Sequence, residues 1–447
     1  MAASLPGICA ISNRRYNGFS RRHGGGMQTR IGKYLLKKKL GAGASGSVYL
    51  ALDEFSGREV ALKIYEAGKS AGISSFARSQ FLTEAALAGR LWHPHIALIM
   101  DACSDDTMSY VVTEFVPGGN LAQFTSPRGL LPVSEVVEIG FKCSGALDYA
   151  FRNNVIHRDI KPANILRTAQ TQVKISDFGV AFIRNAAHTQ IMDAGSPFYA
   201  SPEQATGSEL SHQSDMFSLG VVLYEMLAGK RPFTGETSGQ VLRKLVSVDP
   251  EPLSRIRPDL PGALGEIVMR ALQKAPGDRY GSWAEFALDL AKAGRLSQYD
   301  KTIPDSEKFL ALKTRPMLAE LDDAEIWEFA GAGLWSRLPA YSTVVREGEP
   351  GDSLFLLASG EAKVTLQGRL LNVLATGEWF GEQPFIHGHP VPRQATVETT
   401  VDSVLVEFPR EKLEALGERC QRRFVKALLR TLADRLALSN ERISRMT

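Results

Sequence analysis

Apolar and polar residues alternate along the first part of the chain in the pattern of β-strands. The strand-like runs are residues 34–40, 48–52 and 59–65. Apolar residues then recur at helical spacing in residues 79–92, 133–151, 214–228 and 262–274. The pattern therefore predicts a small strand-rich part followed by a larger helical part.

The pattern changes after residue 293. Residues 294–316 are polar, contain two prolines and lose the helical period, which predicts a linker. Short strand-like runs separated by glycine turns follow, at residues 343–346, 353–358, 362–366, 370–374, 395–398 and 403–408. These runs predict a small antiparallel barrel or roll within residues 317–447.

The last segment, residues 410–445, contains no proline and predicts one long helix. Its apolar residues have the spacing of a heptad-like seam: Val425, Leu429, Leu432, Leu436 and Ile443. Residues 419–447 carry eight Lys or Arg against two acids. This pattern fits a partner surface, including a homodimer through the C-terminal helix, as well as it fits a solvated basic face on an ordinary helix.

Composition is that of an ordinary folded protein. Of 447 residues, 44% are hydrophobic, 23% are charged and 8% are aromatic, so the chain can bury several cores. The net charge is +3, but residues 1–30 hold five arginines and no acid, so the remainder sums to −2. A near-neutral body argues against a nucleic-acid partner.

Residues 1–30 predict no secretory core. We expect them to be a basic flexible arm or untranslated sequence before Met27, in preference to an organelle transit peptide. The four cysteines, Cys9, Cys103, Cys143 and Cys420, lie far apart, which argues against a disulfide framework or a zinc site. No apolar run approaches the roughly 18 residues of a membrane span. These features indicate a cytoplasmic protein.

A glycine-rich segment lies between two predicted strands and reads Gly41-Ala-Gly43-Ala-Ser-Gly46-Ser-Val48. A flap of this kind brings backbone N–H groups close to nucleotide phosphates, where a Cβ would hold the chain away. In the next strand Lys63 stands among apolar neighbours. A buried lysine costs several kcal/mol unless it is paired, and Glu84 on the following helix is the candidate partner.

Two further motifs follow in order, His157-Arg158-Asp159-Ile-Lys161-Pro-Ala-Asn164 and Asp177-Phe178-Gly179. Together with the glycine loop and Lys63, they resemble the signature of eukaryotic-type (Hanks-type) protein kinases. The resemblance implies an α+β, bilobal kinase fold over residues 31–293 and a non-specific serine/threonine protein kinase. It also implies ATP and Mg²⁺ as cofactors and proteins as substrates.

The resemblance implies a role for each matching residue. Asp159 would accept the proton of the substrate hydroxyl, and Lys161 would reach the γ-phosphate, as in kinases that act on serine and threonine. Lys63, paired with Glu84, would hold the α- and β-phosphates. The residues that would hold Mg²⁺ are Asn164 and Asp177. The residues that would surround ATP are Gly41, Gly43, Gly46, Val48, Glu114 and Val116, with Thr113 behind the adenine.

Other matching residues would support the site. Glu203 would pair with Arg279, and Asp215 would hold the catalytic loop. Thr189 is the only hydroxyl residue between the Asp-Phe-Gly motif and Gly195. A phosphate on Thr189 would pair with Arg158 and order the loop; the alternative is an unmodified surface threonine. A pseudokinase scaffold would need a changed Lys63, Asp159 or Asp177, and all three are present.

The C-terminal part contains Gly377-Glu-Trp-Phe-Gly-Glu382 and Pro392-Arg393-Gln-Ala-Thr-Val397. These motifs and the glycine turns before them resemble the cyclic-nucleotide-binding domain, with a β-roll and a C-terminal helix. The resemblance implies that Glu382 bonds the ribose 2′-hydroxyl and that Arg393 pairs with the cyclic phosphate of cAMP or cGMP. No helix-turn-helix pattern follows, which excludes the transcription factors that share this domain.

This sequence departs from that family at Pro384, where relatives use a backbone N–H to bind the phosphate and proline has none. Losing one such donor costs about 1.5–3 kcal/mol, or more than tenfold in affinity. Two functions therefore stay open. The domain regulates the kinase through a cyclic nucleotide, or the kinase is constitutive or autophosphorylation-controlled and the roll is a ligand-free docking or dimerisation module.

Overall fold

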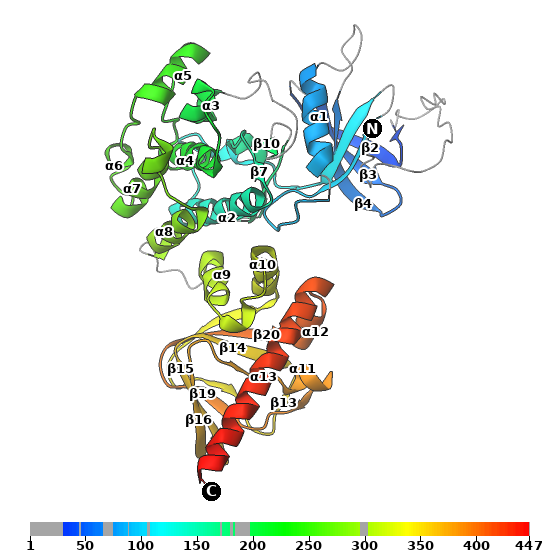
Figure 1. Ribbon diagram of the computed structural model, residues 1–447, viewed down its shortest axis with the longest axis vertical. Coiled ribbons are helices and arrows are strands. Elements are labelled where there is room, and N and C mark those ends of the chain that lie inside the picture. The colour runs from blue at the N-terminus through cyan, green and yellow to red at the C-terminus, as the bar shows by residue number, and fades with distance from the viewer. Residues whose placement is uncertain are drawn as a thin grey trace. The chain divides into compact units, whose positions relative to one another are not determined.

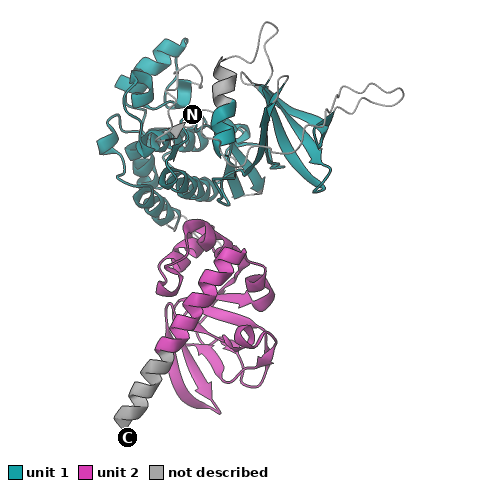
Figure 2. Ribbon diagram, turned by 45° about the vertical axis from the view of Figure 1, so that its right-hand side comes forward, with its two compact units in different colours: residues 1–298 teal, residues 299–447 magenta. Residues whose placement is uncertain are grey.

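The computed structural model describes residues 30–43, 46–65, 75–87, 89–104, 108–169, 172–178, 182–183, 197–295 and 303–446. The predicted basic arm before residue 30 and Thr189 lie outside these residues. The chain forms two compact units, residues 1–298 and 299–447 (Figure 2). Each unit has a hydrophobic core of its own.

The first unit begins with a six-stranded antiparallel sheet, at the upper right of Figure 1. Its strands are β1 (Arg30–Ile31), β2 (Tyr34–Gly43), β3 (Gly46–Asp53), β4 (Arg58–Tyr65), β5 (Ile99–Ser104) and β6 (Ser109–Glu114), in the order β1-β2-β3-β4-β6-β5. Val60 and Leu62 point into one buried layer, so Lys63 and Tyr65 share the opposite face of β4 near helix α1 (Ser75–Leu87). Helix α1 corresponds to the helix predicted over residues 79–92, and it begins and ends a few residues earlier in the sequence.

The larger part of the first unit is helical. Its helices are α2 (Val133–Arg152), α3 (Pro202–Thr206), α4 (His212–Ala228), α5 (Ser238–Ser247), α6 (Leu253–Ile256), α7 (Gly262–Ala271) and α8 (Trp283–Arg295). Short 3₁₀ turns are Leu121–Phe124, Pro162–Asn164, Pro197–Tyr199 and Pro276–Asp278. Two antiparallel pairs complete this part: β7 (Val155–Ile156) pairs with the distant β10 (Phe182–Ile183), and β8 (Ile165–Ala169) forms a hairpin with β9 (Gln172–Ile175).

Helix α4 is the centre of this helical part because it is buried on all sides: every residue from 214 to 227 is buried. Local sequence sets its ends. The Ser211 side chain accepts a hydrogen bond from the backbone of Gln213, and Gly229 ends the helix in the left-handed conformation (φ 70°). A Cβ at Gly229 would also lie 3.1 Å from Pro127, so glycine is required there twice over.

The second unit is a β-roll with helices at its ends. Its strands are β11 (Leu334–Leu338), β12 (Thr343–Val345), β13 (Pro350–Gly351), β14 (Ser353–Ser359), β15 (Glu361–Leu366), β16 (Arg369–Ala375), β17 (Trp379–Phe380), β18 (Val391–Pro392), β19 (Thr396–Thr399) and β20 (Ser403–Pro409). They form two four-stranded sheets, β11-β20-β14-β17 and β12-β19-β15-β16, and the pair β13-β18. Inward side chains of both sheets share one core, which includes Phe355, Leu374 and Val397.

The helices of the second unit are α9 (Asp305–Lys313), α10 (Asp323–Ala332), α11 (Gln383–His387), α12 (Arg410–Glu414) and α13 (Glu418–Met446), with a 3₁₀ turn at Pro316–Leu318. The predicted linker of residues 294–316 is wrong from residue 303 onward. Ile303 and Leu312 are buried in the core of the second unit, and the Phe309 and Trp327 rings lie 4.6 Å apart. Pro304 precedes the first turn of α9, where proline marks a helix start and is no helix breaker.

The prediction of one helix over residues 410–445 is also wrong, because the helix is interrupted between the end of α12 and the start of α13. The seam is corrected too: α13 buries Cys420, Phe424 and Leu428, whereas Val425 and Leu429 are 37% and 62% exposed. The core below the helix decides which apolar stripe is buried, and the spacing alone did not distinguish the two stripes. Among the described residues, no helix has the length and apolar character needed to cross a membrane.

Candidate active site and C-terminal pocket

Lys63 is the centre of a charged cluster in the first unit. Its Nζ lies 2.8 Å from Glu84 Oε1 and 2.7 Å from Asp177 Oδ1, and its side chain is 13% exposed. The predicted partner Glu84 is therefore in contact, and Asp177, which is 114 residues away in the sequence, shares the same ammonium. Tyr65, which sequence reasoning missed, donates a hydrogen bond of 2.7 Å to Glu84 Oε2. Tyr65 lies two residues after Lys63 in the same strand, so the two side chains point to the same face, and this alternation was the signal that could have identified it.

Burial and charge pull in opposite directions within this cluster. Burial raises the pKa of Glu84 to about 7, against the pull of the Lys63 charge. Burial alone would lower the pKa of Lys63, but the charges of Glu84 and Asp177 raise it well above its usual value. Burial alone would raise the pKa of Asp177, but the charge of Lys63 outweighs the effect of burial, so the pKa of Asp177 lies below its usual range. Lys63 and Asp177 are therefore both charged at neutral pH.

The loop before β8 brings Asp159, Lys161 and Asn164 together. Lys161 Nζ lies 2.6 Å from Asp159 Oδ2, and the Asn164 amide donates bonds of 2.9 Å to the same oxygen and to the Asp159 carbonyl. Within the described part of the chain, Asp159 Oδ1 accepts no hydrogen bond. One carboxylate oxygen is therefore held in place and the other can accept a proton from a substrate hydroxyl.

Asp215 holds this loop from below. Its two carboxylate oxygens accept the backbone N–H groups of His157 and Arg158 at 2.7 and 2.8 Å. Burial raises the pKa of Asp215 even though these donors act against it. Arg158 and Asp177 both have positive φ, 70° and 64°, which is strained for residues with a side chain. The carboxylate of Asp215 therefore stabilises a backbone conformation that the loop would not adopt by itself.

Asn164 and Asp177 have the chemistry of a magnesium site. The Asn164 amide nitrogen is used by Asp159, which leaves its oxygen, and Lys63 contacts only one oxygen of Asp177. Carboxylate and amide oxygens are ligands that Mg²⁺ prefers, usually together with waters and substrate phosphates. The pair therefore fits Mg²⁺ bound with a nucleotide, and the described residues hold no separate cluster of three acidic, histidine or cysteine ligands.

The glycine loop and the end of β6 border the predicted ATP site. Gly46 has φ +145°, and a Cβ there would lie 1.9 Å from the Ile64 carbonyl, so glycine is required by close backbone contact. Val48 lies opposite Gly41 on β2 and opposite Lys63 on β4. The register thus places three predicted ATP residues side by side.

At the other border, Glu114 ends β6 and its carboxylate accepts the Leu98 N–H at 2.8 Å and contacts Lys174. Val116 is buried. The Glu114 side chain is therefore used to hold the connection after β6, and its backbone is the part that can meet a ligand.

The segment after the predicted phosphorylation loop docks against the catalytic loop. Gln204 donates a hydrogen bond of 2.8 Å to the Arg158 carbonyl, and the predicted pair of Glu203 with Arg279 is present at 2.8 Å with the Arg279 side chain fully buried. Sequence reasoning missed Glu225, a buried carboxylate that accepts the Tyr199 hydroxyl at 2.6 Å and contacts Arg231 at 3.1 Å. No motif marks it, because Glu225 and its two partners come from three separate segments of the chain.

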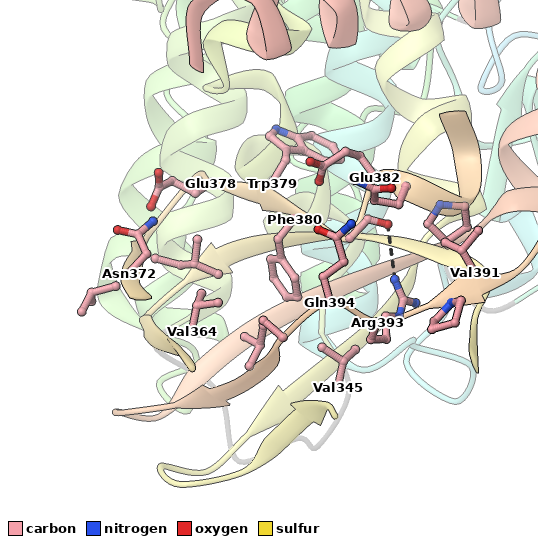
Figure 3. A pocket seen from close by; sticks show the side chains of 18 residues that line it. Val345, Val364, Asn372, Glu378, Trp379, Phe380, Glu382, Val391, Arg393 and Gln394 are labelled. Carbon is pink, nitrogen blue, oxygen red and sulfur yellow. Dashed lines mark hydrogen bonds between the residues drawn. The ribbon is translucent and has the colours of Figure 1, made fainter. Parts of the chain in front are cut away.

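The second unit contains a pocket of about 590 Å³ (Figure 3). Glu382 and Arg393 both line it, so the structure brings the two predicted ligand residues to one cavity. Apolar side chains line its middle, among them Val345, Val364 and Phe380. The cavity is large enough for a mononucleotide and lies wholly within the roll.

Arg393 is held by neutral groups. Its Nη1 donates to the carbonyls of Ser353 at 2.9 Å and Gly381 at 3.3 Å, and its guanidinium lies 5.2 Å from the centre of the Phe355 ring. A Cβ at Gly351 would lie 1.9 Å from Arg393 Nε, so that glycine makes room for the guanidinium. Burial lowers the pKa of Arg393 from its usual value. The sequence does not predict these contacts, because every residue has a backbone carbonyl oxygen and the residue type does not show which of them accepts a hydrogen bond.

The first turn of α11 follows directly after Glu382. Pro384 is buried at the second position of this helix and offers no N–H group to the pocket that it lines. Two polar pocket residues, Asn372 and Glu378, were also missed, because they belong to an edge strand and a turn and carry no motif of their own.

Comparison with known proteins finds one family for each unit. Residues 34–289 match the protein kinase domain family, and residues 335–420 match the cyclic nucleotide-binding domain family. These matches confirm the two predicted resemblances and the α+β fold class. Serine/threonine-protein kinase PrkC of Bacillus subtilis (strain 168) is 34% identical over 306 residues, which are 67% of this chain and 46% of that protein.

Two further proteins are similar to the first unit. Serine/threonine-protein kinase PknB of Mycobacterium tuberculosis (strain ATCC 25618 / H37Rv) is 35% identical over 286 residues, 62% of this chain and 45% of that protein. The crystal structure of the Mycobacterium tuberculosis PknI kinase domain has 30% identity and a TM-score of 0.47, covering 61% of this chain and all of that one. The chain spans less than half the length of the curated relatives it matches.

Proposed function

Because this chain belongs to the protein kinase domain family, we propose that residues 31–293 transfer the γ-phosphate of ATP to serine and threonine hydroxyls of protein substrates. One observation carries this proposal: Asp159, Lys161 and Asn164 form a single hydrogen-bonded group with an open oxygen on Asp159. Phosphoryl transfer needs positioning and charge stabilisation more than covalent chemistry, and this group can supply both.

In this proposal Asp159 accepts the proton of the attacking hydroxyl, and Lys161 stabilises the charge that develops on the γ-phosphate. Lys63 holds the α- and β-phosphates, with Glu84 fixing its position. Asn164 and Asp177 hold Mg²⁺, which neutralises negative charge on the phosphates when it is bound. The glycine loop, Val48, Glu114 and Val116 surround the nucleotide.

Radiolabel transfer from ATP to a protein substrate tests the proposal. We expect Asp159→Asn to lose phosphotransfer by about 10²–10⁴-fold, since a positioned base contributes that much. Asp289→Asn, which changes a partly exposed carboxylate on α8 that pairs with Lys292, is the matched control and should retain full activity. Transfer that survives Asp159→Asn unchanged would reject the assignment of this residue.

We also propose that residues 317–447 bind cAMP or cGMP and thereby regulate the kinase in the cytoplasm. The match to the cyclic nucleotide-binding domain family and the pocket shared by Glu382 and Arg393 support a cyclic nucleotide. The phosphate would replace carbonyl oxygens as acceptor of Arg393, and a bond to a charged acceptor is the stronger one. Regulation further requires that the ligand prefer one of two states of the protein.

One observation favours the alternative, a ligand-free docking or dimerisation roll. Pro384 removes a donor, and carbonyls already satisfy part of the guanidinium. Val425 and Leu429 stay exposed on α13 beside basic residues, which suits a homodimer through this helix. Calorimetry on the full chain with millimolar cAMP and cGMP separates the two functions, and no heat would favour the docking roll. Sedimentation of the full chain and of Leu429→Glu tests the homodimer.

Control by phosphorylation is the remaining part of the proposal. A phosphate on Thr189 would pair with Arg158, which precedes the catalytic aspartate. Mass spectrometry of the autophosphorylated chain should find phosphate on Thr189, and Thr189→Ala should lower activity. An unmodified Thr189 in the active protein would remove this element and leave the catalytic proposal intact.

A further inference from the structure

The C-terminal pocket is polar at two separate ends. Figure 3 shows Arg393 and Glu382 on one side of the cavity, and Asn372 and Glu378 on the opposite side. Between them the lining is mainly apolar, with side chains such as Val364 and Phe380, and Gln394 is a polar residue in this stretch. A ligand that fills this pocket therefore has an anionic end, a flat apolar middle and a hydrogen-bonding edge.

These ends fix the direction of a cyclic nucleotide, if the proposed function of residues 317–447 holds. Arg393 contributes the guanidinium that takes the cyclic phosphate, and Glu382 stands beside it for the ribose hydroxyl. The base must then extend along the apolar middle toward Asn372 and Glu378. Its hydrogen-bonding edge consequently meets one carboxamide and one carboxylate.

Asn372 is available to read that edge. It lies on β16, the edge strand of its sheet, opposite Val364, and its side chain is exposed to the pocket. Its amide makes no hydrogen bond to any described residue. An asparagine carboxamide pairs with adenine in two bonds, accepting from N6–H and donating to N7. Guanine presents O6 and N7 there, both acceptors, and one of them would face the amide oxygen.

Glu378 lies at the same end of the pocket. Its Oε2 accepts the Ala375 N–H at 2.7 Å, which fixes the carboxylate there. A carboxylate is an acceptor only, so it can accept the second hydrogen of adenine N6, but guanine presents the donor N1–H beside O6 on that edge, so the preference rests on Asn372. We infer that this pocket selects cyclic AMP over cyclic GMP, with Asn372 as the residue that reads the base. This inference rests on the proposed cyclic-nucleotide function and names its ligand.

Titration calorimetry on the full chain tests the inference with cAMP and cGMP as separate ligands. We expect cAMP to bind about tenfold or more tightly than cGMP, the discrimination of one good two-bond contact. Asn372→Ala should bring the two affinities together. Asn372→Arg should invert the preference, because an arginine donates two bonds to O6 and N7 of guanine.

Leu371→Ala is the matched control, since Leu371 is on the same strand, is 59% exposed and does not line the pocket. It should bind both nucleotides as the unchanged chain does, and thermal unfolding of each variant verifies its fold. A chain that binds cGMP as well as cAMP, or an Asn372→Arg variant with an unchanged preference, overturns the inference while the cyclic-nucleotide function stands. If neither nucleotide binds at millimolar concentration, the proposed function of this domain fails and the inference fails with it.

Discussion

Lys63 in the first unit and Arg393 in the second stand where their families bind phosphate, yet their surroundings differ. Lys63 contacts two carboxylates at 2.8 and 2.7 Å, whereas Arg393 donates to two neutral carbonyls at 2.9 and 3.3 Å. The charge of Lys63 is thus balanced by carboxylates in direct contact. Among the described residues no carboxylate contacts Arg393, and the negative charges of Glu407 and Asp352 act on it only from a distance. In the proposed functions, a phosphate would join an existing charge network at Lys63 and would supply an anion in direct contact at Arg393.

The difference explains what each cation does before a ligand arrives. Through Glu84 and Asp177, Lys63 holds helix α1 and the Asp-Phe-Gly segment on β4, so the site is organised in advance. Arg393 does not connect separate elements in this way, because its guanidinium lies in a local site formed by Gly351, Gly381 and the Phe355 ring. Exchange of its carbonyl acceptors for a phosphate is the step through which a ligand can change the second unit.

The largest expected effect comes from removing the balanced cation. Lys63→Met leaves two carboxylates in contact with no cation and removes the phosphate contact, so phosphotransfer should fall by about 10²–10³-fold. Initial rates at saturating peptide measure it, with the surface variant Lys292→Met on α8 as control. Activity within tenfold of the unchanged chain would show that the Lys63 network does not serve catalysis.

The unbalanced cation should matter for binding. Arg393→Met removes the charge that a cyclic phosphate needs, and truncation of one partner of a buried charge pair costs about 2–5 kcal/mol, at least 30-fold in affinity. Arg393→Lys keeps the charge but loses the planar fork, so it should bind with intermediate affinity. Calorimetry with cAMP checks both variants. Equal affinity in all three proteins would mean that Arg393 only supports the fold of the roll.

A gain of affinity would sharpen the comparison further. Pro384→Ala restores an N–H in the first turn of α11, and a bond to a charged acceptor is worth about 1.5–3 kcal/mol, so cAMP should bind roughly tenfold more tightly. Pro390→Ala, in the loop after α11, is the control because the N–H group that this substitution introduces lies outside that turn. The idea is wrong if both variants change affinity equally.

The smallest expected effect is a pH dependence that belongs to the first cluster alone. The folded chain holds the pKa of Glu84 at about 7, above the usual value of 4.5. Between these values the folded state binds more protons than the unfolded chain, so this group's stabilising contribution is present below pH 4.5 and is lost as pH rises toward 7. Glu84→Gln should remove about 1 kcal/mol of this dependence from urea unfolding between pH 6 and 7. Parallel pH profiles for the two proteins would contradict the assignment.

Much of the catalytic group was predictable, because Asp159, Lys161 and Asn164 lie within six residues of one loop. Their spacing and types alone indicate the chemistry, and the loop places them within 2.6–2.9 Å of one another. Alternation along the strands also predicted six strands of the roll to within one residue at each end, but not β11 or the two-residue strands β13, β17 and β18. Local interactions set these features, and local interactions are what a sequence pattern records.

The remaining features could not be read locally. The pattern predicts a linker that includes residues 303–313, because this segment has few apolar residues. Only their packing shows that it is helical: Phe309 and Leu312 contact the core of the second unit. Both apolar stripes of α13 fit the helical period, and only the packing of Phe424 and Leu428 shows which one is buried. Burial is a property of the partner surface as much as of the segment itself.

The sequence by itself determined the fold class, the order of the two domains and the residues that we propose to contact phosphate. Only the tertiary structure decided that Lys63 is balanced by Asp177 as well as Glu84, that Arg393 rests on the carbonyls of Ser353 and Gly381, and that Asn372 faces them across the pocket. The physical reason is distance along the chain. Contacts between distant segments, and contacts to backbone oxygens that every residue carries, exist only after the chain has folded.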